Sequence, residues 1–289
     1  MTERIDLAVI GGSGLYQLSG LQHARPLSID TPFGQPSAPI LVGDLDGRGI
    51  AFLARHGLGH TLMPTEVPYR ANIFALKSLG VERIISVSAC GSLREDLAPG
   101  HIVIPDQLFD HTKTRERTFF GGGLVVHLSA PDPFCPSLSR QLAQAVHKTG
   151  ATLHEGGSLI TIEGPRFSTK AESKVYQSWG MALIGMTTAP EAFLAREAEM
   201  CYTVMAHVTD YDVWHESAGT VTVETVVQTL AKNTAAAQAA IRAILRDLSL
   251  ERDCSCPNAL AGAIITRTEA IPPDVLRRLA PLIGKYVAS

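Results

Sequence analysis

The chain has 289 residues, of which 45% are hydrophobic and only 18% are charged. This composition excludes an intrinsically disordered chain and predicts a globular protein with a sizeable core. The 25 basic residues against 28 acidic ones give a formal net charge of −3. That balance argues against a nucleic-acid-binding protein, because such proteins need a concentrated basic face.

The predicted elements of the first half of the chain are short apolar strands that alternate with helical patterns. Strands are predicted at residues 5–10, 39–45, 49–54, 83–87 and 101–104, and a helix at about 65–79, with Pro68 in its first turn. The pair Asp46-Gly47 predicts a tight hairpin between the second and third strands, because both residues tolerate positive φ angles.

The second half continues the alternation of helices and strands. Helices are predicted at 137–149, 169–179, 189–200 and 222–248, and strands at 158–162, 181–184 and 202–208. We therefore predict an α/β protein with one domain, residues 1–250, in which helices flank a central mixed β-sheet. Residues 251–289 carry Pro257, Pro272 and Pro273, and predict a C-terminal appendage with a short amphipathic helix at about 274–286.

The sequence shows no pattern of a membrane anchor or a secretion signal. Apolar runs such as residues 259–265 fall far short of the ~20 residues that a bilayer requires. The start of the chain lacks a basic segment that leads into a long apolar one. The five cysteines are irregularly spaced, unlike a secreted disulfide framework. These features predict a cytoplasmic protein that binds neither membrane nor nucleic acid.

Two polar loops follow predicted strands in the first part of the chain. The segment Gly11-Gly12-Ser13-Gly14 either binds a phosphate through its backbone N–H groups or forms a plain tight turn. Arg55 offers a fork of donors that suits phosphate, and His56 follows it, although a surface arginine and a structural histidine explain the pair equally well. The His56 and His60 spacing is a poor metal site, because intervening glycines oppose a helix.

Three later loops carry further candidate residues. The segment 161–168 combines Glu163 and Arg166 with an aromatic residue and a hydroxyl, which indicates either a site or a structural Glu–Arg pair. Residues 185–188 lead into a helix N-terminus, which favours anions, although a methionine there is more often part of the core. Asp210 and Asp212 follow a strand. They could transfer a proton and bind a base, bind a metal, or cap a helix.

Taken together, these segments resemble the methylthioadenosine phosphorylases of the trimeric purine nucleoside phosphorylase superfamily. The resemblance runs from about residue 5 to 248 and rests on segments in the same order, namely Gly11-Gly12-Ser13-Gly14-Leu15, Thr31-Pro32-Phe33-Gly34, Leu53-Ala54-Arg55-His56-Gly57, Ala89-Cys90-Gly91-Ser92-Leu93-Arg94-Glu95, Thr161-Ile162-Glu163-Gly164-Pro165-Arg166-Phe167-Ser168, Met186-Thr187-Thr188-Ala189-Pro190-Glu191 and Thr209-Asp210-Tyr211-Asp212.

The resemblance implies a phosphorylase reaction. Methylthioadenosine and inorganic phosphate, the co-substrate, would give adenine and methylthioribose 1-phosphate in purine and methionine salvage, with no metal and no organic cofactor. The residues implied in phosphate binding are Ser13, Arg55, His56, Ser88, Ala89 and Thr187. They would act through hydroxyls, backbone N–H groups and the arginine fork.

The resemblance also implies how the nucleoside is held. Met186 would lie under the ribose, and Asp210, the expected catalytic residue, would read the adenine with Asp212. Ser168 would sit near the base, with Phe167 packing close by, and would set specificity together with Val223. Residues expected at the 5' end are Val223 and Val226, with His127 lent by a neighbouring subunit. Such sharing implies a homotrimer or a hexamer of two trimers.

Alternatives remain open at this stage. A sister phosphorylase would act on inosine, guanosine or methylthioinosine, although an enzyme for 6-oxopurines tends to have Asn where this chain has Asp210 and Asp212. A non-catalytic nucleoside- or phosphate-binding protein is the alternative from another class.

The motif Cys254-Ser255-Cys256 lies in the appendage. Some thermophilic relatives carry a similar motif that is linked to disulfide stability. A bridge between residues two apart is strained and reducible, so the motif is either ordinary thiols in a tail or a redox-active or stabilising pair.

Overall fold

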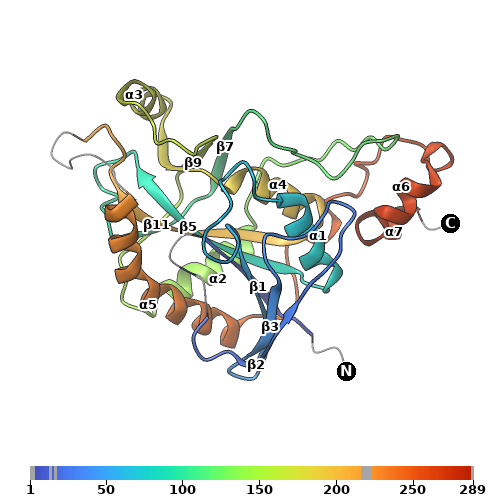
Figure 1. The fold of residues 1–289 in the computed structure, drawn as a ribbon, viewed down its shortest axis with the longest axis horizontal. Coiled ribbons are helices and arrows are strands. Elements are labelled where there is room, and N and C mark those ends of the chain that lie inside the picture. Colours follow the sequence, from blue (N-terminus) through green and yellow to red (C-terminus); the bar gives the residue numbers. More distant parts are fainter. Residues whose placement is uncertain (1–3, 13–14, 16–17, 216–222, 288–289) are drawn as a thin grey trace.

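The computed structural model describes residues 4–12, 15, 18–215 and 223–287 (Figure 1). Its first half contains these elements: β1 (Leu7–Gly11), β2 (Gln22–Leu27), β3 (Ile40–Leu45), β4 (Arg48–Ala54), α1 (Tyr69–Ser78), β5 (Arg83–Ser92), β6 (Ile102–Ile104) and β7 (Gln107–His111). No helix in the described ranges is long and apolar enough to span a bilayer.

The second half alternates helices and strands and ends in two short helices. Its elements are α2 (Pro136–His147), β8 (Leu153–Glu155), β9 (Ser158–Ile162), α3 (Lys170–Ser178), β10 (Met181–Gly185), α4 (Thr188–Glu197), β11 (Cys201–Asp210), α5 (Val223–Asp247), α6 (Pro273–Arg278) and α7 (Ala280–Val287). The predicted helix at 274–286 is therefore two helices, separated at Leu279.

One mixed sheet holds the fold together, as predicted. Its main path runs β2-β3-β4-β1-β5-β10-β9-β7, and β11 pairs with the other edge of β5. Figure 1 shows α1 and α4 on one side of the sheet and α2 and α5 on the other. Strands β4, β1 and β5 of this path are mutually parallel, and β11 is parallel to β5, so the carboxyl ends of all four meet at one edge of the sheet.

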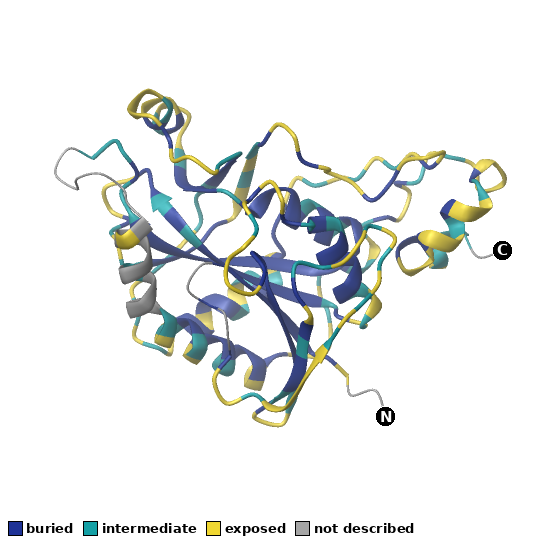
Figure 2. Ribbon diagram, viewed as in Figure 1, coloured by how far each residue is buried: buried dark blue, intermediate teal, exposed yellow. Residues whose placement is uncertain are grey.

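The buried strands were predictable because they are continuous apolar runs, whereas the edge strands were not. Strand β2 is almost wholly exposed, as Figure 2 shows, and its sequence has no apolar alternation. Strand β7 lies at the opposite end of the sheet path and β8 pairs only with the short β6, and neither was predicted. The Asp46-Gly47 hairpin is confirmed, since β3 pairs with β4 and both turn residues have positive φ.

The predicted start of the first helix is wrong by about one turn. Helix α1 begins at Tyr69, and Pro68 is its N-cap residue rather than part of its first turn. The residue before a proline is disfavoured in the helical conformation, so Val67 cannot continue a helix toward Pro68.

The C-terminal appendage packs onto the same core as the rest of the chain. Leu260, Leu279 and Ile283 are fully buried in the main apolar cluster. Glu199 fixes the appendage through Leu260 N–H, which donates to Oε1 at 3.1 Å, and through Lys285 Nζ at 2.6 Å from Oε2. The boundary at residue 250 stays a prediction.

Glu197 gives the fold a predictable pH dependence. Its carboxylate accepts hydrogen bonds from Phe119 N–H (2.8 Å) and Thr118 Oγ1 (2.7 Å), and burial raises its pKa from 4.5 to about 7. The folded state therefore binds this proton more tightly than the unfolded state, so the free energy of unfolding falls as pH rises from 4.5 through 7. The expected loss between about pH 5.5 and about pH 8 is about 2 kcal/mol, measured by urea unfolding at these two pH values.

The variant Glu197→Gln should lose most of this pH dependence. Glu172→Gln is the matched control, because the Arg166 guanidinium lowers the pKa of Glu172 to about 2, below the window tested. An equal pH slope in the wild type and in Glu197→Gln would contradict the assignment.

Candidate active site

Four chain segments meet at the carboxyl edge of the sheet, beside β5. Gly12 follows β1, and a Cβ at that position would lie 2.6 Å from the Val87 carbonyl oxygen and 2.7 Å from Arg55 Nη1. Strand β10 runs antiparallel to β5, with Ile184 opposite Gly91. A Cβ at Gly185, the last residue of β10, would lie 3.4 Å from Cys90 Sγ, and Met186 and Thr187 follow Gly185 in the chain.

Arg55 lies beneath this meeting point and is almost completely buried. Its Nε and Nη2 donate to the two oxygens of Glu191 at 2.8 and 3.1 Å, Nη2 also donates to Ser86 Oγ at 2.6 Å, and Nη1 donates to the Val87 carbonyl at 3.2 Å. Burial opposes the charge, but Glu191 more than offsets it and raises the pKa of Arg55. Within the described residues, one hydrogen of Nη1 is left to reach a ligand.

His56 follows Arg55 and is neutral at physiological pH. Burial, followed by the charge of Arg55, lowers the pKa of His56 to about 4. Its Nδ1 is 2.9 Å from the Leu62 carbonyl oxygen, so Nδ1 carries the proton and Nε2 cannot donate. The backbone N–H of His56 makes no hydrogen bond within the described part of the chain. His56 can therefore donate to an anion through its backbone and not through its ring.

Buried hydroxyls without partners mark the same place. Ser88 Oγ and Thr188 Oγ1 are both buried and have no hydrogen-bond partner among the described residues. Thr187 is the N-cap residue of α4 and its side chain does not cap the helix. A helix N-terminus with free hydroxyl donors favours an anion. This end of the site suits an oxyanion such as phosphate.

Met186, Gly164 and Gly91 lie close to the oxyanion end of the site. A Cβ at Gly164 would lie 2.7 Å from Met186 Sδ, and one at Gly91 would lie 2.9 Å from Ile184 Cγ2 and 3.0 Å from Asp210 Oδ1. Both positions need glycine because the neighbouring atoms leave no room for a side chain. Met186 therefore packs against Gly164, and the Asp210 carboxylate packs against Gly91.

Asp210 and Asp212 occupy the far end of the site. Asp210 Oδ2 accepts from Thr209 Oγ1 at 2.6 Å, and Oδ1 accepts from the Asp212 backbone N–H at 2.8 Å. Burial raises the pKa of Asp210; burial and the nearby Asp210 carboxylate raise the pKa of Asp212. Asp212 Oδ2 is buried without a partner among the described residues. These are hydrogen-bonding groups poised to meet a ligand that carries donors.

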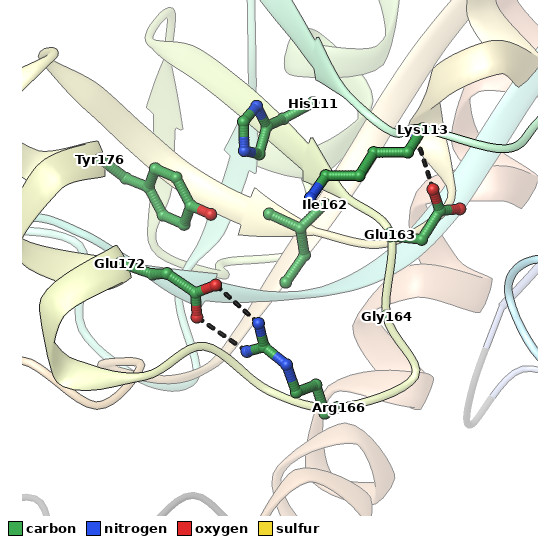
Figure 3. A pocket seen from close by; sticks show the side chains of 8 residues that line it. All are labelled: His111, Lys113, Ile162, Glu163, Gly164, Arg166, Glu172 and Tyr176. Atoms are coloured by element: carbon green, nitrogen blue, oxygen red, sulfur yellow. Dashed lines mark hydrogen bonds and ion pairs between the residues drawn. The ribbon is translucent and has the colours of Figure 1, made fainter.

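Beside this end, residues of β7, β9 and α3 line an open hollow (Figure 3). Figure 3 shows His111, Lys113 and Tyr176 around it, with Ile162 at its floor. The loop that closes it continues into Phe167, which is partly exposed, and Ser168, whose Oγ is buried and without a partner in the described residues.

The structural Glu163–Arg166 pair, which the sequence left open as an alternative, does not form. Glu163 Oε1 instead accepts from Arg115 Nε at 3.1 Å, and Arg166 forms two bonds of 2.7 and 2.6 Å to Glu172. Arg115 also donates to the Ala189 carbonyl at 2.7 Å, so it braces the loop against the start of α4. The loop is therefore fixed by residues from outside its own motif.

The comparisons with known proteins agree with this arrangement. Residues 6–246 match the family model of the phosphorylase superfamily. An S-methyl-5'-thioadenosine phosphorylase of Geobacter sulfurreducens is 54% identical over 97% of this chain and 99% of its own, and one of Chloroflexus aurantiacus is 51% identical over 97% and 98%. A methylthioadenosine phosphorylase structure from an Antarctic soil metagenome has a TM-score of 0.92 and 46% identity, covering 97% of this chain and 99% of its own.

The chain belongs to the S-methyl-5'-thioadenosine phosphorylase family. The predicted fold, a central mixed sheet flanked by helices, is confirmed. The names of these relatives agree with the predicted enzyme class, a pentosyltransferase. A Schistosoma mansoni relative, 32% identical with a TM-score of 0.82 over 97% of this chain and 98% of its own, was solved with adenine.

Several predicted site residues of this phosphorylase are not tested by the geometry. Ser13 lies outside the described residues, as do the side chains of Val223 and Val226, whose backbone begins α5. His127 is exposed, and its N–H donates to the Ala263 carbonyl of the appendage at 2.9 Å. Figure 1 shows this part of the chain beside α6 and α7, at the opposite end of the molecule from α3.

Glu191 is the site residue that sequence reasoning missed. It was quoted as part of a motif but given no role, although it neutralises Arg55 and accepts from Tyr202 Oη at 2.8 Å. The missed signal was an acidic residue in the first turn of a helix whose next four residues are apolar, where burial demands a cationic partner.

Proposed function

We propose that this chain cleaves methylthioadenosine with inorganic phosphate, through a phosphate site at Arg55, His56, Ser88, Ala89 and Thr187 and a base site at Asp210 and Asp212. The observation that supports this division best is the pattern of buried polar atoms without partners. Ser88 Oγ stands at one end, and Asp212 Oδ2 and Ser168 Oγ at the other, within the described residues. Buried polar groups are costly unless a ligand completes them.

The reaction follows from this arrangement. Phosphate is a weak nucleophile, so the bond between the sugar and adenine must weaken early and leave positive charge on the ribosyl carbon. The bound phosphate oxygen forms the new bond to that carbon and balances its charge. Met186 contributes a thioether that packs under the sugar without acting as a nucleophile.

The base leaves with the electron pair of the broken bond and needs a proton at N7. Asp210, with its raised pKa, is suited to hold that proton and share it with N7, while a second carboxylate oxygen accepts from the exocyclic amino group. The roles of Phe167, Ser168, Val223 and Val226 stay predictions, with Ser168 and Val223 as specificity residues. No step in this scheme uses a metal or an organic cofactor, and a cytoplasmic location also stays a prediction.

The assembly we propose is a homotrimer or a hexamer of two trimers, in which His127 serves a neighbouring site. Two exposed apolar patches support a ring. Phe109 and Trp179 form one beside α3, and Val125 and Ile265 form the other beside His127, at 42, 49, 50 and 60% exposure. Patches at opposite ends of one chain can join head to tail, which closes a ring. Analytical ultracentrifugation measures the number of chains.

Ser88→Ala is expected to raise the KM for phosphate by about tenfold to a hundredfold, because a hydrogen bond to a charged oxygen contributes about 1.5–3 kcal/mol. Steady-state kinetics at varied phosphate measures this. The matched control is Ser178→Ala at the exposed end of α3, where the hydroxyl bonds only to the Val175 carbonyl. An unchanged KM for phosphate in Ser88→Ala would remove Ser88 from the phosphate site.

The decisive experiment measures the release of free base from methylthioadenosine, adenosine, methylthioinosine and inosine, each with and without phosphate. We expect phosphate-dependent release that favours methylthioadenosine. Preference for the inosine compounds would keep the family and overturn the reading of Asp210 and Asp212. Release without phosphate would indicate a hydrolase, and binding of adenine without turnover would indicate a binding protein.

A further inference from the structure

Four of the five cysteines meet at one point outside the active site. Cys135 precedes α2, Cys201 begins β11, and Cys254 and Cys256 belong to the appendage. All four Sγ atoms lie within 4.8 Å of one another, and those of Cys201 and Cys254 are 3.4 Å apart. The two thiols of the tail motif are therefore packed against two core thiols, and whether they are ordinary thiols stays a question for the test below.

The spacing of the sulfurs suits a tetrahedral metal ion. Zinc binds thiolates at about 2.3 Å, which places the sulfurs of a tetrahedron about 3.8 Å apart. The Sγ–Sγ distances in the cluster range around this value, from 3.4 Å between Cys201 and Cys254 to at most 4.8 Å. Small side-chain adjustments would therefore reach it. Cys135, Cys201 and Cys256 are at most 2% exposed, and the partly exposed Cys254 leaves an entry path.

The surroundings favour negative charge on the sulfurs. Arg196 Nη1 lies 3.2 Å from Cys256 Sγ, and Cys135 is the N-cap residue of α2, where the helix dipole is positive. A zinc ion with four thiolates carries a net charge of about −2, which Arg196 and the helix N-terminus partly balance.

We propose that Cys135, Cys201, Cys254 and Cys256 bind one zinc ion in a closed structural site. Each thiol gives its proton to solvent as its thiolate bonds to the metal, and no electron is transferred. The ion ties the appendage to the first residue of β11 and to the start of α2. This site is new relative to the expectation of no metal, and it takes no part in the proposed reaction.

The competing state of the same four sulfurs is a pair of disulfides. Its formation needs an oxidant, whereas zinc binding needs only the loss of protons. A bridge within Cys254-Ser255-Cys256 would be strained, so the bridges would have to cross between the appendage and the core or join Cys135 to Cys201. The two states differ in metal content and in the number of thiols, and both can be counted.

The test uses the full chain expressed in zinc-supplemented medium and purified without chelator. We expect about one zinc per chain by elemental analysis, and a Tm that falls on treatment with a strong chelator and returns when Zn²⁺ alone is added back. Cys254→Ser should retain no zinc against the chelator. Cys90→Ser makes the same change at the cysteine outside the cluster and should keep one zinc per chain.

Two results would overturn the proposal. One is a reduced wild-type chain that takes up no zinc when Zn²⁺ is added, with all thiols still titratable. The other is an intact mass, measured without reductant, that shows the cluster thiols oxidised to disulfides in the purified protein. Both measurements are made on the wild type, so they hold even if Cys254→Ser fails to fold. Neither depends on phosphorolysis.

Discussion

Glu191→Ala is expected to lower the free energy of unfolding by about 3–5 kcal/mol, and Tm by roughly 10 °C. The substitution leaves the Arg55 guanidinium buried without its counter-charge and leaves the Tyr202 hydroxyl without its acceptor. Urea unfolding of both proteins at one protein concentration measures the loss. The phosphate KM should also rise, because Arg55 then turns away from Val87 and the neighbouring backbone.

The control is Arg166→Ala, which breaks an ion pair of similar geometry on the surface and leaves Glu172 in the capping box of α3. Arg166 is 65% exposed in that pair, so its loss should cost no more than about 1 kcal/mol. The double variant Arg55→Leu with Glu191→Leu removes both charges and should be more stable than Glu191→Ala. A loss below about 1 kcal/mol in Glu191→Ala would contradict the buried-pair argument.

Asp210→Asn is expected to lower kcat/KM for methylthioadenosine by about 10²–10³, because an amide cannot hold the proton that N7 requires. The same change should raise the ratio of methylthioinosine to methylthioadenosine cleavage, since an amide can donate to a 6-oxo group. Kinetics with both nucleosides at saturating phosphate measure both effects.

Asp247→Asn makes the same chemical change on an exposed carboxylate of α5 and should leave both rates unchanged. If the substrate ratio of Asp210→Asn equals that of the wild type, Asp210 does not read the base. A normal phosphate KM in the same variant would show that the other end of the site is intact.

The sequence was informative where local pattern decides structure. Buried strands such as β1 are apolar runs that end in glycine or polar loops, and parallel strands bring those loops to one edge of the sheet. Strands β2 and β7 were missed because exposed edge strands carry no such pattern.

Contacts between residues that are far apart in the chain could not be predicted from the sequence. Arg55 and Glu191 are 136 residues apart, and nothing local says that one neutralises the other. The same holds for the cysteines: the short motif at Cys254 was visible, but its approach to Cys201 depends on how the appendage returns to the core. For His56, the family pattern predicted a phosphate ligand, whereas the bond to Leu62 restricts it to its backbone N–H.

The pairing of Arg55 with Glu191 leaves the oxyanion end of the site with almost no net charge, since His56 is neutral as well. Such a site selects its anion by the direction of each hydrogen bond rather than by attraction at a distance. Hydroxyls such as that of Ser88 can accept as well as donate, and monohydrogen phosphate offers them a proton where sulfate has none. The chain would thus distinguish two tetrahedral anions of equal charge by a single hydrogen atom.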